Sequence, residues 1–578
     1  MKTIVLLLSA MFLPQFLHAT NWLFKDGHSD YTIVLSKDAS ATEQHAAQEL
    51  SAYIQQIGGV KIPVTTSLQV SDKHIHVGFS TRVASLTGDT CPADSAESFT
   101  YMTIGNDLII YGGRKMGTAY GVYNFLEQEL GIRWYSTDIT KVPRLTQYKL
   151  PKLNRYESPF FRHRHVMYYQ MHHNMQLNVH NRLNMRFGEW IDKAGYGKIE
   201  AFWGGHTFEV LIPPGKYFAK HPEYFSLRDG KRISDGQLCL SNSEVIQVLK
   251  ERMYQIIKEN PGFAAYGLSQ NDNQKFCECR NCQTLVQKYE SQSGLLIWAV
   301  NQVAEAVEAK FPDTNIFTFA YQYTRKAPRG IRPRNNVIVR LCSIECCFLH
   351  PIEGTEENIP FMTDLKSWAT LTQNLYIFDY VTGFAQFTAP FPNFHVMAKN
   401  LQTFRQHHVI GVLELGQYQS NGGEFAEMKQ WMLSKLLWNP YQDVDKLANQ
   451  FIGDYYGPAA PHVLKYYKLC CNLVKSNTHM KFDTDCFNPI YTESFLKEGR
   501  KLLDNALKMC RDDSAITRRV EQVRAQVLYL QMKHSPFIST FDGTAKSFYQ
   551  LVKRDKIYVH ENLPPEEFFA KSKRGFLY

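Results

Sequence analysis

Between residues 159 and 440, short apolar runs alternate with stretches of helical period, and this alternation constrains the fold more than any other feature of the chain. Helical stretches lie at 244–258, 294–311 and 397–407. Near-continuous apolar strands separated by helices are typical of a parallel sheet covered on both faces. A (β/α)8 (TIM) barrel is the economical architecture, and a doubly wound open sheet is the alternative. The runs with the composition of buried strands are 160–167, 262–269, 315–320, 336–341, 375–378 and 409–413.

The segments on either side of this region have different patterns. Before it, strand-like and helical stretches alternate over a shorter length: 32–36, 42–57, 74–78, 107–111 and 116–130. After it, apolar residues recur at three- and four-residue spacing, which predicts helices at 444–451, 460–475, 491–510 and 514–533. We therefore expect an α/β protein with an N-terminal α/β accessory domain (20–150), a (β/α)8 catalytic barrel (151–440) and a C-terminal helical region (441–578).

The first residues have the order of a secretory signal peptide. Lys2 is followed by the apolar run 4–17, and Ala19 supplies the small residue of a cleavage site. The run is too short to span a bilayer comfortably, which disfavours a membrane anchor. We expect residues 1–19 to be removed and the mature chain to be exported, periplasmic or extracellular, with no transmembrane segment.

Composition and charge narrow the class of protein. The chain is 44% hydrophobic and 13% aromatic, which excludes a disordered protein. The 64 Lys and Arg residues exceed the 55 Asp and Glu residues only slightly, and they are scattered along the chain. Because no basic patch forms, nucleic acid is not an expected partner.

Two parts of the sequence resemble known families. Residues 111–127 and 130–135, with the helix around 46–50, look like the accessory domain that precedes the barrel in α-glucuronidases and β-hexosaminidases. Segments 221–225, 237–241, 269–272 and 455–459 resemble a large family of glycosidase-like barrels of unassigned function, found in bacteria that degrade complex glycans. These resemblances imply a carbohydrate-active barrel and an oligo- or polysaccharide partner, but no agreed mechanism.

Four carboxylates follow the ends of predicted strands, where the active site of a (β/α)8 barrel lies: Asp272, Glu345, Asp379 and Glu414. A glycosidase needs one carboxylic acid for the leaving group and one carboxylate as base or nucleophile. Asp272 is the first choice for the acid. Hexosaminidase-type barrels have an adjacent acidic pair at a similar strand end, whereas here Asn271 precedes Asp272.

Sugar-binding groups are expected among aromatic rings and forked donors near the same strand ends. A glycine-rich loop presents Trp203 and His206, Asn271 adjoins the catalytic candidate, and Tyr321 and Tyr380 lie at strand ends. Arg164 ends the first strand candidate and would pair the carboxylate of a uronic acid.

The chain has twelve cysteines, and three of them, Cys277, Cys279 and Cys282, lie within six residues. Together with Cys239 they allow disulfides, which are ordinary in an exported protein, a four-thiolate zinc site, or free thiols. Either disulfides or a zinc site at these cysteines would hold the loop that carries Asp272. Neither a cofactor nor a catalytic metal is expected.

The predicted function is that of an exported, exo-acting glycoside hydrolase, α-glucuronidase-like, in which Asp272 acts with Glu414 or Asp379. Two alternatives remain open: a non-catalytic glycan-binding protein on a degenerate barrel, and a polysaccharide lyase.

Overall fold

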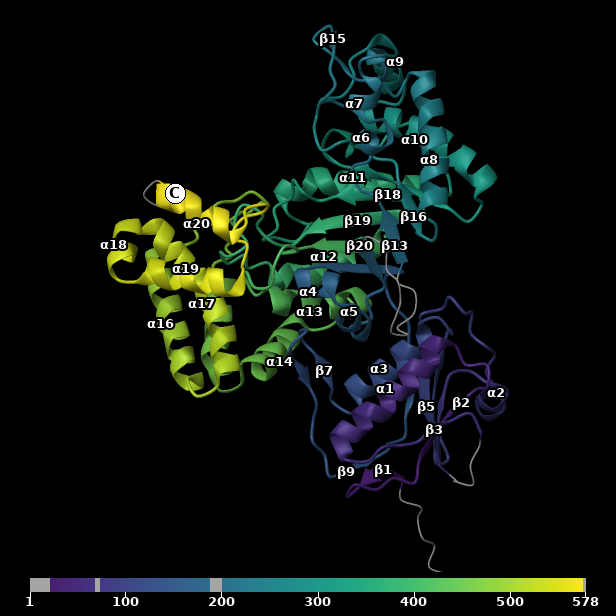
Figure 1. Cartoon of the computed structure of the whole chain (residues 1–578), viewed down its shortest axis with the longest axis vertical. Helices are drawn as coiled ribbons and strands as arrows, with labels where there is room; N and C mark the ends of the chain where they lie inside the picture. Colours follow the sequence, from purple (N-terminus) through teal and green to yellow (C-terminus); the bar gives the residue numbers. More distant parts are fainter. Residues whose placement is uncertain (1–20, 68–72, 188–199, 575–578) are drawn as a thin grey trace, which may run out of the picture. The chain divides into compact units, whose positions relative to one another are not determined.

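The structure is a computed structural model that describes residues 21–67, 73–187 and 200–574 (Figure 1). The predicted signal peptide, 1–19, lies outside the described residues. The chain divides into two compact units. The first comprises the residues up to Gly131 and Val142–Glu157, and the second comprises Ile132–Lys141 and the residues from Ser158 onward.

The first unit is built on a six-stranded sheet of order β10-β5-β6-β4-β2-β3. Strands β6, β4, β2 and β3 are parallel, whereas β5 and β10 add to the sheet in antiparallel fashion. Strands β1 and β9 form a separate antiparallel pair. The elements are β1 (Trp22–Lys25), β2 (Thr32–Leu35), α1 (Ala41–Gly58), β3 (Val64–Thr65), β4 (His74–Val77), α2 (Thr81–Thr87), β5 (Phe99–Ile104), β6 (Asp107–Gly112), α3 (Gly117–Gln128), β9 (Gln147–Lys149) and β10 (Asn154–Glu157).

Helix α1 shows why the local sequence folds as it does. Ser40 and Glu43 form a reciprocal capping box at its start, which satisfies two backbone N–H groups that have no helical partner. Gly59 ends the helix in the left-handed conformation, at φ 75°. The apolar face of α1 packs on α3.

The second unit contains a sheet of eight parallel strands in the order β11-β20-β19-β18-β17-β16-β13-β12. The first strand, β11, pairs with the last, β20, and every other pair of neighbours in the sheet is consecutive among its strands. The order therefore lacks the reversal that a doubly wound sheet requires. The strands are β11 (His163–Met167), β12 (Met185–Phe187), β13 (Glu200–Trp203), β16 (Ala265–Gly267), β17 (Asn315–Ala320), β18 (Val337–Cys342), β19 (Leu375–Tyr380) and β20 (Gly411–Leu415).

Aromatic rings from strands that are not neighbours meet on one face of this sheet, so the sheet is curled. The ring of Phe202 on β13 lies 5.6 Å from that of Tyr376 on β19 and 5.3 Å from that of Phe317 on β17. We call this face the inner face. At the two ends of the sheet, the Arg164 N–H donates to the side chain of Asn184 at 2.8 Å, and the Asn184 N–H donates to the Arg164 carbonyl at 3.3 Å. The protein is thus a mixed α/β protein with a curled parallel sheet, consistent with a TIM-like fold.

Helices connect the strands and cover the outer face of the sheet. Helix α10 packs on β17 and β18, and α13 packs on β11. The helices and short elements of this region are β7 (Arg133–Trp134), β8 (Thr140–Lys141), α4 (Tyr169–His173), α5 (Met175–His180), α6 (Phe208–Leu211), α7 (Pro214–Tyr217), β14 (Leu227–Arg228), β15 (Lys231–Arg232), α8 (Ser243–Glu259), α9 (Arg280–Lys288), α10 (Gln292–Lys310), α11 (Ile359–Leu371), α12 (Phe394–Gln406) and α13 (Ala426–Trp438).

The rest of the second unit is helical. Helix α16 packs on α15 and α17, and α19 packs on α17, so these helices lie side by side (Figure 1). None of the helices in the described part of the chain has the length and hydropathy needed to cross a membrane. The C-terminal helices are α14 (Val444–Tyr456), α15 (Ala460–Cys471), α16 (Glu493–Cys510), α17 (Ser514–His534), α18 (Pro536–Phe541), α19 (Thr544–Asp555) and α20 (Pro565–Arg574).

The six strands predicted from apolar runs in 159–440 are confirmed as β11, β16, β17, β18, β19 and β20. Strands β12 and β13 of the eight-stranded sheet were not predicted. Strands β1, β3, β5, β9 and β10 of the first unit and the two-residue strands β7, β8, β14 and β15 were not predicted either. The predicted helices of the C-terminal region are also confirmed, within a few residues at their ends.

Candidate functional site

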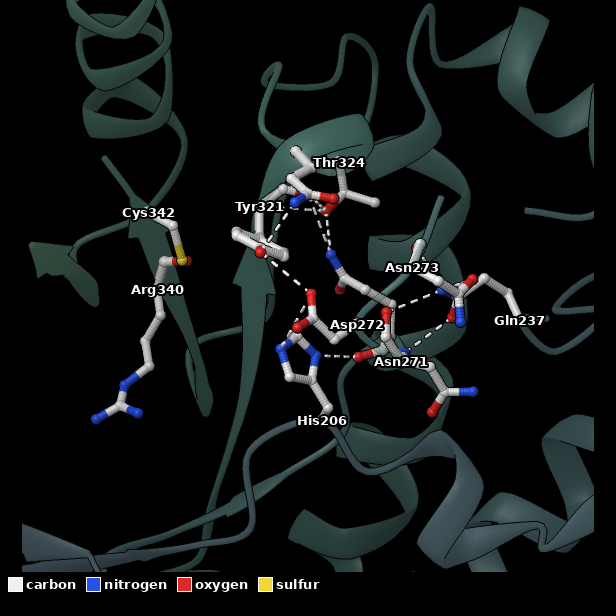
Figure 2. A network of polar contacts seen from close by, with 11 residues as sticks. His206, Gln237, Asn271, Asp272, Asn273, Tyr321, Thr324, Arg340 and Cys342 are labelled. Carbon is white, nitrogen blue, oxygen red and sulfur yellow. Dashed lines mark hydrogen bonds and ion pairs between the residues drawn. The ribbon is translucent and has the colours of Figure 1, made fainter. Parts of the chain in front are cut away.

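The carboxyl ends of the parallel strands gather at one edge of the sheet, which we call the carboxyl edge. The loops after β13, β16 and β17 place His206, Asp272 and Tyr321 there. Figure 2 shows the Asp272 carboxylate between the Tyr321 hydroxyl and the His206 ring. In (β/α)8 enzymes, residues at this edge perform the chemistry.

Asp272 is the exposed centre of this group. Its side chain is 64% exposed, and its Oδ1 accepts a hydrogen bond of 3.1 Å from the Tyr321 hydroxyl. His206 Nε2 lies 4.0 Å from the same oxygen. The other ring nitrogen of His206, Nδ1, lies 2.5 Å from the Gln270 carbonyl, which fixes the orientation of the imidazole.

The loop that carries Asp272 is held by the side chain of Gln237. Its amide nitrogen donates to the carbonyls of Asn271 and Asn273 at 2.9 and 2.8 Å, and its amide oxygen accepts from the Asn271 N–H at 2.9 Å (Figure 2). The Asn271 side chain is itself bound to backbone, donating to the Gly236 carbonyl and accepting from the Glu209 N–H. Asn271, expected to contact substrate, thus positions the loop.

A second carboxyl group comes from the C-terminal region and was not among the candidates predicted from the sequence. Glu561 accepts a hydrogen bond of 2.9 Å from Tyr418, in the loop after β20. Burial raises the pKa of Glu561, and the charge of Asp272 raises it further, so the two carboxyl groups lie within electrostatic reach. The only signal in the sequence is a short apolar run, 557–559, that interrupts the helices.

Tyr380 completes the group. Its side chain is buried, and burial raises the pKa of its hydroxyl well above the usual value. The charges of Asp272 and Glu561 both add to this shift. We call His206, Asp272, Tyr321, Tyr380 and Glu561 the Asp272 cluster.

The segment that carries Glu561 is fastened to the loops after β19 and β20. The Phe387 N–H donates to the Val559 carbonyl at 2.8 Å, and the Glu561 N–H donates to the Phe384 carbonyl at 3.1 Å. Gln417 donates to the Tyr558 carbonyl at 3.1 Å. Glu561 is therefore positioned by backbone contacts to the carboxyl edge, although it lies far along the chain from these strands.

Glu345 follows β18 but is engaged in an ion pair. Arg325 contacts Glu345 through Nη1 and Asp364 through Nε, the latter at 2.8 Å. A groove of about 900 Å³ lies between segment 325–330 and helix α11, and it is lined by Arg325 and Asp364. No lining residue of this groove belongs to the Asp272 cluster.

Asp379 and Glu414 lie on the outer face of the sheet. Asp379 on β19 is paired with Glu414 on β20. Each lies three residues after a residue that faces inward, Tyr376 or Gly411, so the alternation of side chains along a strand directs both carboxyl groups outward. Asp379 accepts a hydrogen bond from Ser343, and burial raises its pKa to about 6. Burial, then the charge of Asp379, raises the pKa of Glu414 well above its usual range. The structure pairs these carboxyls with each other and does not place them in the Asp272 cluster.

Arg164 and Trp203 also lie on the outer face. Arg164 is fully buried, donates to the carbonyls of Arg182 and Phe161 at 2.8 Å, and lies 5.1 Å from the ring of Trp438 in α13. Trp203 follows the inward-facing Phe202 and lies 6.4 Å from the ring of Tyr266. The structure therefore does not bring either side chain to the inner face.

The four cysteines Cys239, Cys277, Cys279 and Cys282 converge. Their sulfur atoms all lie within 4.8 Å of one another, with Cys239 3.6 Å from Cys279 and 3.9 Å from Cys282. All twelve cysteines belong to the described residues, and none of them is joined to another by a disulfide. The disulfides considered from the sequence are not formed at these distances, because a disulfide needs about 2.05 Å.

A curled parallel sheet with polar side chains at its carboxyl edge is the arrangement of a TIM-like α/β fold. The chain belongs to the family of the domain of unknown function DUF4838, whose model matches residues 134–468. No curated protein matches the chain.

Solved structures similar to this chain are glycoside hydrolases. The 4-O-methyl-α-glucuronidase BtGH115A, of family GH115, has a TM-score of 0.59 and 12% identity, over 91% of this chain and 76% of that one. A β-N-acetylhexosaminidase from Bacteroides fragilis has a TM-score of 0.45 and 10% identity, over 73% of this chain and 90% of that one. At such identities the similarity shows the fold alone.

Proposed function

We propose that this protein is an exported glycoside hydrolase whose acid/base pair is Asp272 and Glu561. The observation that carries the proposal is the contrast between the two carboxyl groups. Glu561 is partly buried and its pKa is raised, partly by Asp272, whereas Asp272 is exposed and accepts a hydrogen bond from Tyr321. Two interacting carboxyls in unlike environments are the pattern of a glycosidase acid and its partner.

In the proposed reaction, Glu561 donates its proton to the glycosidic oxygen as the bond to the anomeric carbon breaks. Asp272 either takes a proton from the water that attacks this carbon or attacks the carbon itself, and water then releases the sugar. Tyr321 orients the Asp272 carboxylate. Tyr380 and His206 supply a ring and a polar group beside it for the sugar.

The proposal includes a complete (β/α)8 barrel, closed between β11 and β12, with catalytic residues at the carboxyl edge. It also includes cleavage of the signal peptide, the domain boundaries near residues 150 and 440, and an accessory role for the N-terminal domain. We also propose exo-acting, α-glucuronidase-like specificity, which is the activity named for BtGH115A, a protein of similar fold. Arg164 is not assigned to the uronate, because its guanidinium binds backbone carbonyls on the outer face.

Roles for the remaining sequence candidates follow from their contacts. We assign Asp379, Glu414, Arg164 and Trp203 to packing of the outer face, and Asn271 to holding the Asp272 loop. Glu345 braces Arg325, which lies in the loop after β17.

The test is Asp272→Asn. We expect kcat to fall by about 10²- to 10⁴-fold, the usual contribution of a positioned acid or base, with the melting temperature unchanged because the side chain is exposed. Activity is measured on a panel of aryl glycosides, including an α-glucuronide, and on plant polysaccharides, with product stereochemistry followed by NMR.

The matched control is Asp512→Asn, another exposed aspartate, which lies beside Arg511 in the C-terminal helical region, outside the cluster. It should retain full activity. Equal activity of Asp272→Asn and wild type would overturn the assignment. An unsaturated product absorbing in the ultraviolet would identify a lyase instead, and glycan binding without product would identify a binding protein.

A further inference from the structure

The sulfur atoms of Cys239, Cys277, Cys279 and Cys282 have the spacing of a tetrahedral metal site. A zinc–sulfur bond of about 2.3 Å requires sulfur–sulfur edges of about 3.8 Å. The two distances from Cys239, 3.6 and 3.9 Å, lie on either side of this value. We propose that these four cysteines bind one structural zinc ion as thiolates.

The groups around the sulfurs are suited to a thiolate cluster. The Leu227 N–H donates to Cys277 Sγ at 3.3 Å, and Arg232 Nη1 lies 3.7 Å from the same atom. The Ser241 hydroxyl lies 3.1 Å from Cys282 Sγ. Four thiolates and a zinc ion carry a net charge of −2, which these N–H and O–H groups and the arginine offset.

The local fold also needs such a crosslink. Between residues 218 and 242, the described backbone has only one 3₁₀ turn and a hairpin of two-residue strands, β14 and β15. Cys239, Cys277 and Cys282 are nevertheless buried. A segment with so little regular structure gains order from a bound metal ion.

The zinc ion would stabilise the loop that carries Asp272. Cys239 lies two residues after Gln237, and Cys277 lies two residues after Lys275. The Gln237 N–H donates to the Lys275 carbonyl at 3.1 Å, and the Gln237 side chain binds Asn271 and Asn273. Only this consequence for activity depends on the proposed function; the zinc site itself does not.

Metal content of the purified full-length protein, measured by mass spectrometry after dialysis without chelator, tests the proposal. We expect Cys279→Ser to lose one zinc per chain relative to wild type, and the matched control Cys91→Ser, an exposed lone cysteine, to lose none. Equal zinc in Cys279→Ser and wild type would overturn the proposal. So would the loss of four hydrogen masses in the intact protein at these cysteines, which denotes two disulfides.

A cobalt experiment keeps the proposal testable if the serine variant does not fold. Protein prepared with cobalt in place of zinc should show thiolate-to-cobalt charge-transfer bands and the intense visible absorption of a tetrahedral site. Absence of these bands in a cobalt-loaded protein would contradict a four-thiolate site.

A separate observation points to a second zinc site in the same unit. Cys347 Sγ lies 3.4 Å from Nδ1 of both His350 and His479. Tetrahedral zinc with one sulfur and one nitrogen requires an edge of about 3.5 Å. Since Cys347 and His350 follow β18 and His479 follows α15, a metal ion here would tie the loop after β18 to the C-terminal region.

The outer nitrogens of the two imidazoles have the partners that metal-bound histidines usually have. Nε2 of His479 lies 3.0 Å from the Glu357 carboxylate, and Nε2 of His350 lies 3.1 Å from the Lys475 carbonyl. Such partners hold the N–H on Nε2 and leave Nδ1 as the ligand. We infer that Cys347, His350 and His479 bind a zinc ion, with water as the fourth ligand.

The two sites are separable by metal content. Wild type should hold two zinc ions, and His350→Gln and Cys279→Ser one each. The control His28→Gln, an exposed histidine of the first unit, should hold two. If His350→Gln and wild type hold equal zinc, the second site is excluded. Since metal content is measured without substrate, these outcomes are independent of whether Asp272 is catalytic.

Discussion

Glu414 and Asp379 show how the same residue type takes different roles on two faces of one sheet. Both follow apolar strand sequence, as Asp272 does, and a carboxyl in such a place suggests catalysis. Because side chains alternate between the two faces of a strand, both carboxyl groups point to the outer face. Burial there raises the pKa of both. Asp272 instead follows its strand by several residues and reaches the carboxyl edge.

Asp379→Asn should make stability less dependent on pH. Between the unfolded pKa of about 3.9 and the folded pKa of about 6, the folded state holds a proton that the unfolded state releases, so wild-type stability falls as pH rises through this window. Asparagine keeps the acceptor for Ser343 and carries no charge. Its advantage over wild type should grow by about 3 kcal/mol between pH 4 and pH 7, measured by urea unfolding.

Asp512→Asn, at an exposed position in the C-terminal helical region, should follow the pH profile of the wild type. Parallel profiles for Asp379→Asn and wild type would refute the raised pKa. Glycosidase activity of Asp379→Asn at pH 5 should equal that of wild type, which separates a packing role from catalysis.

At the scale of elements, the loop 270–275 depends on a side chain from another loop. The Gln237 side chain forms hydrogen bonds with backbone groups of Asn271 and Asn273. The residue types of the loop gave no indication of this dependence, because Gln237 is distant in sequence and glutamine is common on surfaces.

Gln237→Leu should therefore loosen the Asp272 loop. The lost hydrogen bonds are worth about 1–3 kcal/mol where buried groups are left unpaired. We expect faster hydrogen exchange in residues 270–275 and a lower kcat/KM. Gln247→Leu, on the exposed face of α8 and paired with Glu251, is the matched control and should change neither quantity. Unchanged exchange in Gln237→Leu would show that the loop is held by other contacts.

Many of the longer helices and strands could be predicted from local sequence, because burial of one face imposes a hydrophobic period. Helices α8 and α17, with stop and start signals at their ends, and strands β17 and β18, with apolar runs, agree closely with prediction. Strands β12 and β13 have only three and four residues, and neither has more than three consecutive apolar residues. Their pairing with neighbours in the sheet forms them, and single-sequence periodicity does not contain that information.

At the scale of the whole molecule, the C-terminal region contributes a residue to the candidate site. Glu561 reaches the Asp272 cluster because the segment around it is hydrogen-bonded to the loops after β19 and β20. The helical region is thus part of the proposed active site and not only a covering of the sheet.

Glu561→Gln should remove the proton donor. The wild-type activity should fall as pH rises through the raised pKa of Glu561, because only the protonated acid assists the leaving group. The variant should lose this basic limb, and kcat on a natural glycan should fall about 10²- to 10⁴-fold. On a 4-nitrophenyl glycoside, which needs little protonation, the loss should be small.

Glu566→Gln, an exposed residue at the start of α20, serves as the control and should keep the wild-type pH profile. If Glu561→Gln retains the basic limb, another group is the acid. A comparable loss on both substrates would indicate that Glu561 supports the structure of the site instead of donating a proton.

The sequence by itself determined many of the longer helices and strands, the mixed α/β class and the candidacy of Asp272, since these depend on local period and on strand ends. It also showed that the thiols of Cys277, Cys279 and Cys282 are close. Only the tertiary structure decided which face each strand side chain occupies, which removed Glu414, Asp379 and Arg164 from the cluster and added Glu561. The physical reason is that register, curl and long-range backbone pairing set these placements, and they join residues hundreds of positions apart.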